Sequence, residues 1–208
     1  MKIIGITGGV GCGKSEVLAF IEKNYDAAVV RADEVGRDLM RPGTDCTRQI
    51  LALFGGKAAD DSGKLDRAWI ADQIFHDPEK RDALNAIVHP AVRREVCRLI
   101  EQNRACGWKY FFLESAILIE ADYRDICDEI WYIHVEKEQR IGRLLAGRGG
   151  SREKWEAFIA NQPEDAFFRK NTDVTIENQG SFPELRTNIR RENGLVQTDP
   201  HESIYPMR

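Results

Sequence analysis

Lys2-Ile-Ile-Gly-Ile-Thr7 is followed directly by Gly8-Gly-Val-Gly-Cys-Gly-Lys14-Ser15. A short apolar strand thus precedes the pattern G-x-x-x-x-G-K-[ST], and the helical run from Glu16 to Glu22 comes after it. Glycines allow the backbone to turn its N–H groups inward, and the helix adds its positive dipole end, so this arrangement binds phosphates. The alternative is a glycine-rich turn with an incidental lysine, which the flanking strand and helix make much the weaker interpretation. The segment predicts a loop that binds a nucleoside triphosphate.

The residues of this loop have distinct predicted roles. Lys14 can reach the β- and γ-phosphates, and the Ser15 hydroxyl can bind Mg²⁺. The main chain of the loop and of the first helical residues is expected to surround the phosphates. The predicted nucleotide-binding residues here are Gly8, Gly9, Val10, Gly11, Cys12, Gly13, Lys14, Ser15 and Glu16.

Length and composition narrow the class of protein. A chain of 208 residues suits one α/β domain with insertions. The net charge of −4, with both signs interspersed, gives no basic footprint for nucleic acid. No apolar run approaches the ~20 residues of a membrane span, and the immediate start of the first strand leaves no room for a signal peptide. The five cysteines show no C-x-x-C pair, which favours free thiols in a reducing compartment. We expect a cytoplasmic protein without nucleic-acid or membrane partners, and no obligate protein partner is indicated.

Strand and helix patterns alternate along the chain, which predicts a parallel sheet covered by helices on both faces. Ligands of such sheets bind beyond the carboxyl ends of the strands. Further strands are expected at 27–31, 110–113, 130–135 and 173–177, and a long helical region at 33–104. A helix at 137–146 is expected to end at Gly147, and Ser151 is expected to cap the next helix, with an apolar stripe of Trp155, Phe158 and Ile159.

Asp33 follows the second predicted strand, and Arg37 stands four residues further on. In a phosphotransferase, an Asp at this place can orient the acceptor hydroxyl and take its proton, while an arginine binds the acceptor's phosphate. Alternatively, Asp33 caps a helix and forms a surface ion pair with Arg37. The spacing alone supports these two interpretations equally.

Two further positions are candidates with equally plain alternatives. Glu114 ends the third predicted strand, where a carboxylate can hold Mg²⁺ or be an ordinary exposed acid. His89-Pro90 lies between two helical patterns, and proline suits the first turn of a helix. On the pattern alone, His89 is a structural residue at a helix start.

Basic residues gather around a glycine break after the fourth strand. On a hinged helical hairpin such arginines can close over a triphosphate and neutralise charge during transfer. A solvated basic face is the alternative, but the phosphate loop favours a lid. The residues are Arg140, Arg143, Arg148 and Arg152, around 147–150.

Together these segments resemble the dephospho-coenzyme A kinase family over residues 2–185. The phosphate loop is shared by many kinases, whereas the other matching segments are more specific. They are Ala32-Asp-Glu-Val-Gly-Arg37 with Pro42-Gly43, Ile74-Phe75, Leu84-Asn-Ala-Ile-Val-His-Pro90, Ile117-Leu-Ile-Glu120, the run Arg143 to Gln162, and Asp173-Val-Thr-Ile-Glu-Asn-Gln-Gly-Ser181.

The resemblance implies one P-loop kinase domain over 1–193, followed by a polar tail at 194–208. Within the domain it implies a helical subdomain at about 60–104 that holds the coenzyme A moiety, and a lid at about 137–170. The implied reaction is transfer of the ATP γ-phosphoryl group to the ribose 3′-hydroxyl of dephospho-coenzyme A, with Mg²⁺, as the last step of coenzyme A synthesis.

The resemblance also implies roles for individual residues. Asp33, Lys14 and Arg143 would be catalytic, with Asp33 as the base and Arg143 as a lid arginine. Acceptor contacts would come from Asp33, Arg37, His89 and Arg140. The nucleotide would also contact Arg143, Arg148, Asn178 and Gly180, the last two near adenine, and Mg²⁺ would be held by Ser15 and Glu114.

Some positions depart from the family pattern. None of them removes Lys14, Ser15 or Asp33, so we expect activity with altered lid contacts. The departures are Glu16 for a hydroxyl residue, Arg31 for an acid, Ala116 for a proline, Gly147 where a lid arginine is usual (Arg148 follows it), and Phe168 where a basic residue is usual (Arg169 follows it).

Two other functions compete with this one. Another small-molecule kinase, acting on a nucleoside, nucleotide or sugar acid, would share the loop but would not need the segment 84–90. A regulatory GTP switch would use Asp33-Glu-Val-Gly36 as its D-x-x-G motif. No Asn-Lys-x-Asp motif for guanine occurs in the chain, so the switch is the weaker alternative, and preference for ATP over GTP would exclude it.

Overall fold

A computed structural model describes residues 1–193, and the predicted tail at 194–208 lies outside the described residues. The chain forms two compact units. The first contains Met1–Val29 and the described residues from Asn103 onward, and the second contains Val30–Gln102. No helix among residues 1–193 is long and apolar enough to cross a membrane.

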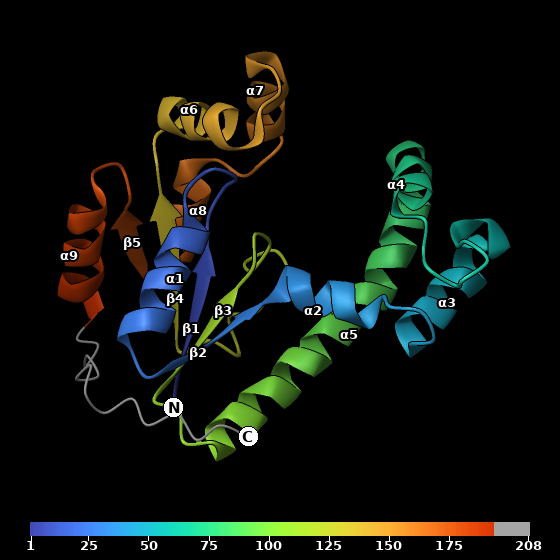
Figure 1. The fold of residues 1–208 in the computed structure, drawn as a ribbon, viewed down its shortest axis with the longest axis horizontal. Coiled ribbons are helices and arrows are strands. Elements are labelled where there is room, and N and C mark those ends of the chain that lie inside the picture. Colours follow the sequence, from blue (N-terminus) through green and yellow to red (C-terminus); the bar gives the residue numbers. More distant parts are fainter. Residues whose placement is uncertain (194–208) are drawn as a thin grey trace. The chain divides into compact units, whose positions relative to one another are not determined.

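The sheet confirms the predicted α/β class. Its strands are β1 (Lys2–Thr7), β2 (Ala27–Arg31), β3 (Tyr110–Glu114), β4 (Glu129–His134) and β5 (Val174–Glu177), in the order β2-β3-β1-β4-β5 (Figure 1). β1 pairs in parallel with both β3 and β4, and β4 pairs in parallel with β5. The parallel strands end at one edge, where the loop after Thr7 begins.

One face of the sheet carries the main apolar core of the first unit. Ile4 and Ile6 share this face because alternate strand residues point the same way, and both are fully buried. The helices α1 (Lys14–Asn24) and α9 (Phe182–Asn193) contribute to the same core with Val17, Leu18, Phe20, Ile21, Leu185 and Ile189. Each fully buried side chain of this size contributes about 1.5–3 kcal/mol. The strand and the helix on either side of the glycine loop are therefore both firmly anchored.

The opposite face is also covered closely. A Cβ placed at Gly5 would lie 2.9 Å from Leu118 Cδ1, so the segment after β3 packs directly against β1. On the same face, Phe168 of α8 (Asp165–Asn171) stacks on Tyr132 of β4 with ring centroids 4.7 Å apart. Helices thus lie on both faces of the sheet, as predicted.

The second unit is helical. It consists of α2 (Ala32–Leu39), α3 (Asp45–Phe54), the short 3₁₀ helix η1 (Gly56–Ala58), α4 (Arg67–His76) and most of α5 (Pro78–Ala105). Thr44 and Asp66 cap α3 and α4 through hydrogen bonds to the N–H groups of Thr47 and Trp69. A separate apolar core holds these helices together, with Ile50, Leu65 and Ile70 buried against Leu84, Ile87 and Val88.

The helices after β4 form a hairpin beyond the carboxyl ends of the strands (Figure 1). They are α6 (Lys137–Arg148) and α7 (Arg152–Ala160), and we refer to them as the lid hairpin. The Ser151 hydroxyl accepts the Lys154 N–H at 3.3 Å, which confirms the predicted cap. Ile141, Leu144, Trp155 and Ile159 form its apolar cluster, and Val10 of the glycine loop packs against them.

The structure corrects several local predictions. Pro90 does not start a helix but lies inside α5, because apolar residues at Val92, Val96 and Ile100 continue one buried face past it. α6 runs through Gly147 and ends at Arg148, since Gly149 has the positive φ of 65° that ends it.

Two more corrections concern the end of the chain's first unit. Phe158 is 51% exposed, because it is rotated by about 100° from Ile159 on α7 and leaves the buried stripe. The short helix α8 and the largely polar helix α9 were not predicted, since neither has a long apolar pattern.

Asp173 provides a test of stability. Its carboxylate accepts the Ile130 N–H at 2.7 Å and binds Arg124 Nη2 at 2.6 Å. The hydrogen bond from Arg124 lowers the pKa of Asp173, so the ionised form stabilises the fold above the ordinary pKa of about 4, and this contribution disappears as the pH falls below it. We expect Asp173→Asn to lower the free energy of unfolding by about 1 kcal/mol at pH 7, because the side chain is 33% exposed. Urea unfolding between pH 7 and pH 3 should show the difference shrinking with acidification, whereas a constant difference would contradict this account.

Candidate active site

The glycine loop between β1 and α1 has the geometry of an anion site. Gly8 and Gly13 have φ angles of 147° and 84°, which favour glycine, and a Cβ at Gly8 would lie 2.7 Å from the Ile133 carbonyl oxygen. Among residues 1–193, the main-chain N–H groups of Gly11, Gly13 and Ser15 make no hydrogen bond. These donors stand at the N-terminus of α1, where a phosphate group would satisfy them.

Lys14 is held within the loop. Its Nζ donates to the Gly8 carbonyl at 2.7 Å and lies 3.6 Å from Glu114 Oε1. The side chains of Lys14 and Glu114 are each only 13% exposed, so the pair is little screened by water. The ammonium group is therefore positioned on the loop without a substrate.

Ser15 and Glu114 fit the binding of Mg²⁺. Ser15 is exposed in the first turn of α1, and Glu114 is the last residue of β3. In the part of the chain that the structure describes, no cluster of three or more His, Cys, Asp or Glu forms a metal cage. Mg²⁺ does not need one, because it keeps several waters and binds through one or two carboxylates plus substrate phosphates. The metal role of both residues stays a prediction.

Cys12 is a structural part of the loop. Burial raises the pKa of its thiol, which is 1% exposed. Its carbonyl oxygen accepts a hydrogen bond from Asn178 Nδ2 at 2.9 Å. Asn178, predicted near the nucleotide, is itself buried, so it connects the turn after β5 to the loop.

Arg143 of α6 reaches the same turn and the same loop. Its Nη2 donates to the Asn178 carbonyl at 2.7 Å. Its Nη1 is buried, has no hydrogen-bond partner among residues 1–193, and lies 3.4 Å from where a Cβ of Gly13 would stand. Buried donors are normally hydrogen-bonded, so this guanidinium nitrogen and the nearby loop N–H groups would together bind an anion.

Arg140 lies on the loop itself. Its Nε donates to the Val10 carbonyl at 2.8 Å, and its Nη2 donates to Gln162 Oε1 at 2.5 Å. Arg140 was predicted to contact the acceptor. The structure places its side chain on the main chain of the loop, and the acceptor role stays a prediction. Gln162 was not predicted as a site residue, although it ends the run Arg143 to Gln162 that matches the family.

The other predicted nucleotide residues are less constrained. Arg148 ends α6, is exposed, and makes no hydrogen bond or ion pair within the described residues. Gly180 lies in the turn after β5, where a Cβ would stand 1.9 Å from Glu184 Oε2. Gln139 of α6 donates to the Gln179 carbonyl at 3.1 Å, so the lid hairpin is linked to this turn.

The predicted acceptor residues Asp33, Arg37 and His89 all lie in the second unit and are exposed. Asp33 is the second residue of α2, not its cap. Arg37 pairs with Glu34 at 3.6 Å and donates to the Asp33 carbonyl oxygen rather than to its carboxylate. The alternative of a capping Asp with an Asp33–Arg37 ion pair is therefore wrong. His89 lies within α5, one turn before Val92, which contacts Gly36 of α2.

Comparison with known proteins identifies the family. The model of the family described as "Dephospho-CoA kinase" matches residues 2–184. The chain belongs to the dephospho-CoA kinase family. The matched residues include the loop, the predicted acceptor residues of the second unit, the lid hairpin and the turn after β5.

Two curated relatives and one solved structure are similar to this chain over most of its length. A dephospho-CoA kinase of Corynebacterium diphtheriae is 39% identical over 181 residues, covering 87% of this chain and 90% of the relative. A dephospho-CoA kinase of Symbiobacterium thermophilum is 38% identical, covering 91% of this chain and 79% of the relative. A Thermus thermophilus protein of known crystal structure superposes with a TM-score of 0.77 at 31% identity, covering 91% of this chain and 95% of that one.

Proposed function

We propose that this protein transfers the γ-phosphoryl group of ATP to the ribose 3′-hydroxyl of dephospho-CoA, giving CoA and ADP. The observation that carries the proposal is the Nη1 of Arg143, which is buried and unpaired within the described part of the chain and lies beside the loop that holds Lys14. Such a set of donors suits the polyphosphate of a nucleotide. Membership of the dephospho-CoA kinase family supports the choice of acceptor.

The transfer itself asks little covalent chemistry of the protein. The bond between the γ-phosphorus and the bridging oxygen to the β-phosphate breaks, and a bond from the ribose 3′-oxygen to that phosphorus forms. Lys14, Arg143 and the loop N–H groups stabilise the charge on the phosphate oxygens. When bound, Mg²⁺ would neutralise charge on the β- and γ-oxygens, held by Ser15 and Glu114. The carboxylate of Asp33 orients the 3′-hydroxyl and accepts its proton.

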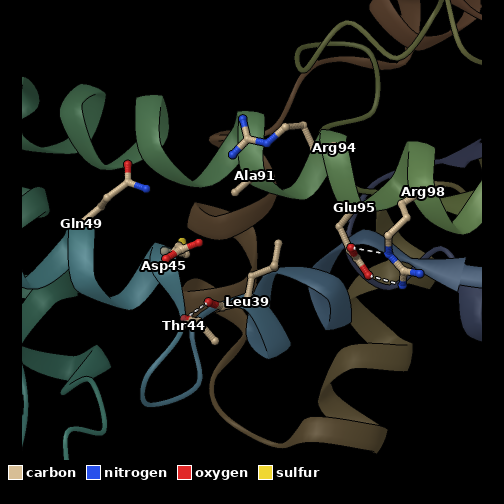
Figure 2. A pocket seen from close by; sticks show the side chains of 9 residues that line it. Leu39, Thr44, Asp45, Gln49, Ala91, Arg94, Glu95 and Arg98 are labelled. Carbon is tan, nitrogen blue, oxygen red and sulfur yellow. Dashed lines mark hydrogen bonds and ion pairs between the residues drawn. The ribbon is translucent and has the colours of Figure 1, made fainter.

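The other groups of the acceptor need a binding site of their own, and the second unit contains a cavity lined by charged, polar and apolar residues. The cavity measures about 310 Å³. Figure 2 shows Gln49 and Asp45 of α3 and Leu39 of α2 opposite Ala91 and Arg94 of α5. Glu95 and Arg98, which also line it, bind each other through two hydrogen bonds.

The lining carries two carboxylates, Asp45 and Glu95, and two guanidinium groups, of which Arg94 is the one that is not already paired within the described residues. Asp45 is paired with Arg48, and Glu95 with Arg98. Arg94 makes no hydrogen bond or ion pair within residues 1–193. The cavity therefore offers one uncompensated guanidinium, an amide at Gln49 and apolar surface at Leu39 and Ala91. We assign it to the coenzyme A moiety, whose diphosphate is anionic and whose arm bears amides.

Arg94→Ala tests this assignment. We expect the KM for dephospho-CoA to rise about tenfold, the lower end of a charge-assisted hydrogen bond because Arg94 is exposed. The kcat and the KM for ATP should change little. Arg41→Ala, which removes a 72% exposed arginine of the same unit, is the matched control. An unchanged KM for dephospho-CoA in Arg94→Ala would remove this cavity from the acceptor site.

The reaction is tested by ADP release from ATP and Mg²⁺ in the presence of dephospho-CoA, adenosine, AMP or shikimate, with CoA identified as product. Release that depends on dephospho-CoA would support the proposal, and release with another acceptor alone would replace it.

We also assign the protein to the cytoplasm, because all five cysteines are free thiols, as is usual in a reducing compartment.

A further inference from the structure

Gln162, which follows the lid hairpin, holds the glycine loop through its side-chain amide oxygen. That oxygen accepts the Val10 main-chain N–H at 3.0 Å and Arg140 Nη2 at 2.5 Å. Arg140 Nε in turn donates to the Val10 carbonyl at 2.8 Å. The three residues form a closed ring in which both main-chain polar groups of Val10 are bound by side chains from outside the loop.

The ring depends on an acceptor at position 162. A peptide N–H and a guanidinium are both donors and offer no lone pair, so the amide of Gln162 must present its oxygen to them. Loss of this oxygen would leave two donors without their partner. Leaving partly buried donors unpaired costs more than forming one hydrogen bond gains.

Arg140 shows why the ring matters for the loop. Its guanidinium lies directly on Gly9, since a Cβ at that glycine would stand 2.1 Å from Nη2. Burial lowers the pKa of Arg140, which reflects a cationic group withdrawn from water. Gln162 supplies a neutral acceptor that keeps this cation oriented on the loop.

Val10 is also anchored through its side chain, which packs against the apolar cluster of the lid hairpin. The residue is therefore fixed to the lid hairpin by packing and to Arg140 and Gln162 by its main chain. The N–H groups of Gly11, Gly13 and Ser15, which follow it, make no hydrogen bond within the described residues. Val10 is therefore held by the rest of the protein, whereas the N–H groups that follow it can bind phosphate.

We propose that Gln162 is a positioning residue of the phosphate loop. It sets the loop conformation through Val10 and holds Arg140 over Gly9, so that the triphosphate meets a preformed site. It touches no reacting atom and acts through these two residues. The inference rests on the proposed nucleotide site and adds the residue that prepares it.

The test compares Gln162→Met with Gln162→Glu by calorimetric titration with ATP and Mg²⁺, without acceptor. Methionine has a similar length but is a poor acceptor, so we expect the Kd for ATP to rise about tenfold. Glutamate keeps both acceptor positions, so its Kd should stay within about threefold of the unmodified protein. Asn161→Ala, which removes an exposed amide at the adjacent position, should leave the Kd unchanged.

Thermal unfolding of each variant shows whether it is folded. If Gln162→Met does not fold, Gln162→Asn takes its place with the same expected rise, because the shorter amide cannot reach Val10 and Arg140 together. A Kd unchanged in the folded variant that lacks the acceptor would overturn the inference, and so would an equal loss in Gln162→Glu. Because the titration uses ATP alone, failure to phosphorylate dephospho-CoA would count against the proposed reaction and leave this result intact.

Discussion

Replacing Lys14 with alanine is expected to lower kcat about 10³-fold, because an electrostatic contact to the transferring phosphoryl group is lost. Lys14 Nζ already lies on the loop, bound to the Gly8 carbonyl at 2.7 Å, so little reorganisation precedes its contact with phosphate. Glu114 Oε1 lies 3.6 Å from Lys14 Nζ, and its side chain is only 13% exposed. Loss of Lys14 would therefore leave the negative charge of Glu114 near the phosphates without this neighbouring cation. Both effects disfavour the charge that builds up on the phosphate oxygens during transfer.

Steady-state ADP release is the measurement for Lys14→Ala. Lys23→Ala is the matched control, because Lys23 lies exposed in the last turn of the same helix and should be replaceable without effect. Thermal unfolding separates lost chemistry from lost fold. Near-normal turnover in a folded Lys14→Ala variant would contradict the assignment of the loop.

Replacing Asp33 with asparagine is expected to lower kcat by about 10²-fold or more, which is the range for loss of a general base. The affinity for ATP should be retained, because the role that we propose for Asp33 is at the acceptor and not at the nucleotide. Two structural roles are excluded, because Asp33 neither caps α2 nor pairs with Arg37, and its side chain is exposed. An amide at this position still orients the hydroxyl but cannot take its proton.

Asp38→Asn provides the control for this experiment. Asp38 lies on the same helix, is 64% exposed, and pairs only with the exposed Arg41 in the described residues, so its replacement should leave turnover unchanged. The kcat and the Kd for ATP are measured for both variants. Unchanged kcat in Asp33→Asn would remove Asp33 from the mechanism, and a parallel loss of ATP binding would place it at the nucleotide instead.

Local features of this protein could be predicted from neighbouring residues. The glycine loop is one, because the turn of its backbone depends on consecutive residues such as Gly8 and Gly13 and on the helix that begins at Lys14. The parallel sheet is another, since continuous apolar strands alternate with helical patterns. The cap at Ser151 was predicted for the same reason, as its partner Lys154 is three residues away.

Helix limits were less predictable where local preference and packing disagree. Pro90 favours a helix start by itself, but the buried face through Val92 and Val96 makes α5 continue. Gly147 was expected to end α6, but an available glycine two residues later, Gly149, has the conformation that ends the helix. For α5, burial of apolar surface outweighs the preference of one residue.

The sequence by itself therefore determined the phosphate loop, the class of fold and, through its motifs, the family. Only the tertiary structure decided which distant side chains complete the site. Gln162 and Arg140 meet Val10 across 152 and 130 residues of chain, and Asn178 meets Cys12 across 166. The cavity in the second unit likewise joins residues of α2, α3 and α5. The conformation of a backbone turn depends on neighbouring residues. Contacts between distant residues form only when the helices and strands pack together, so they cannot be predicted from a local sequence pattern.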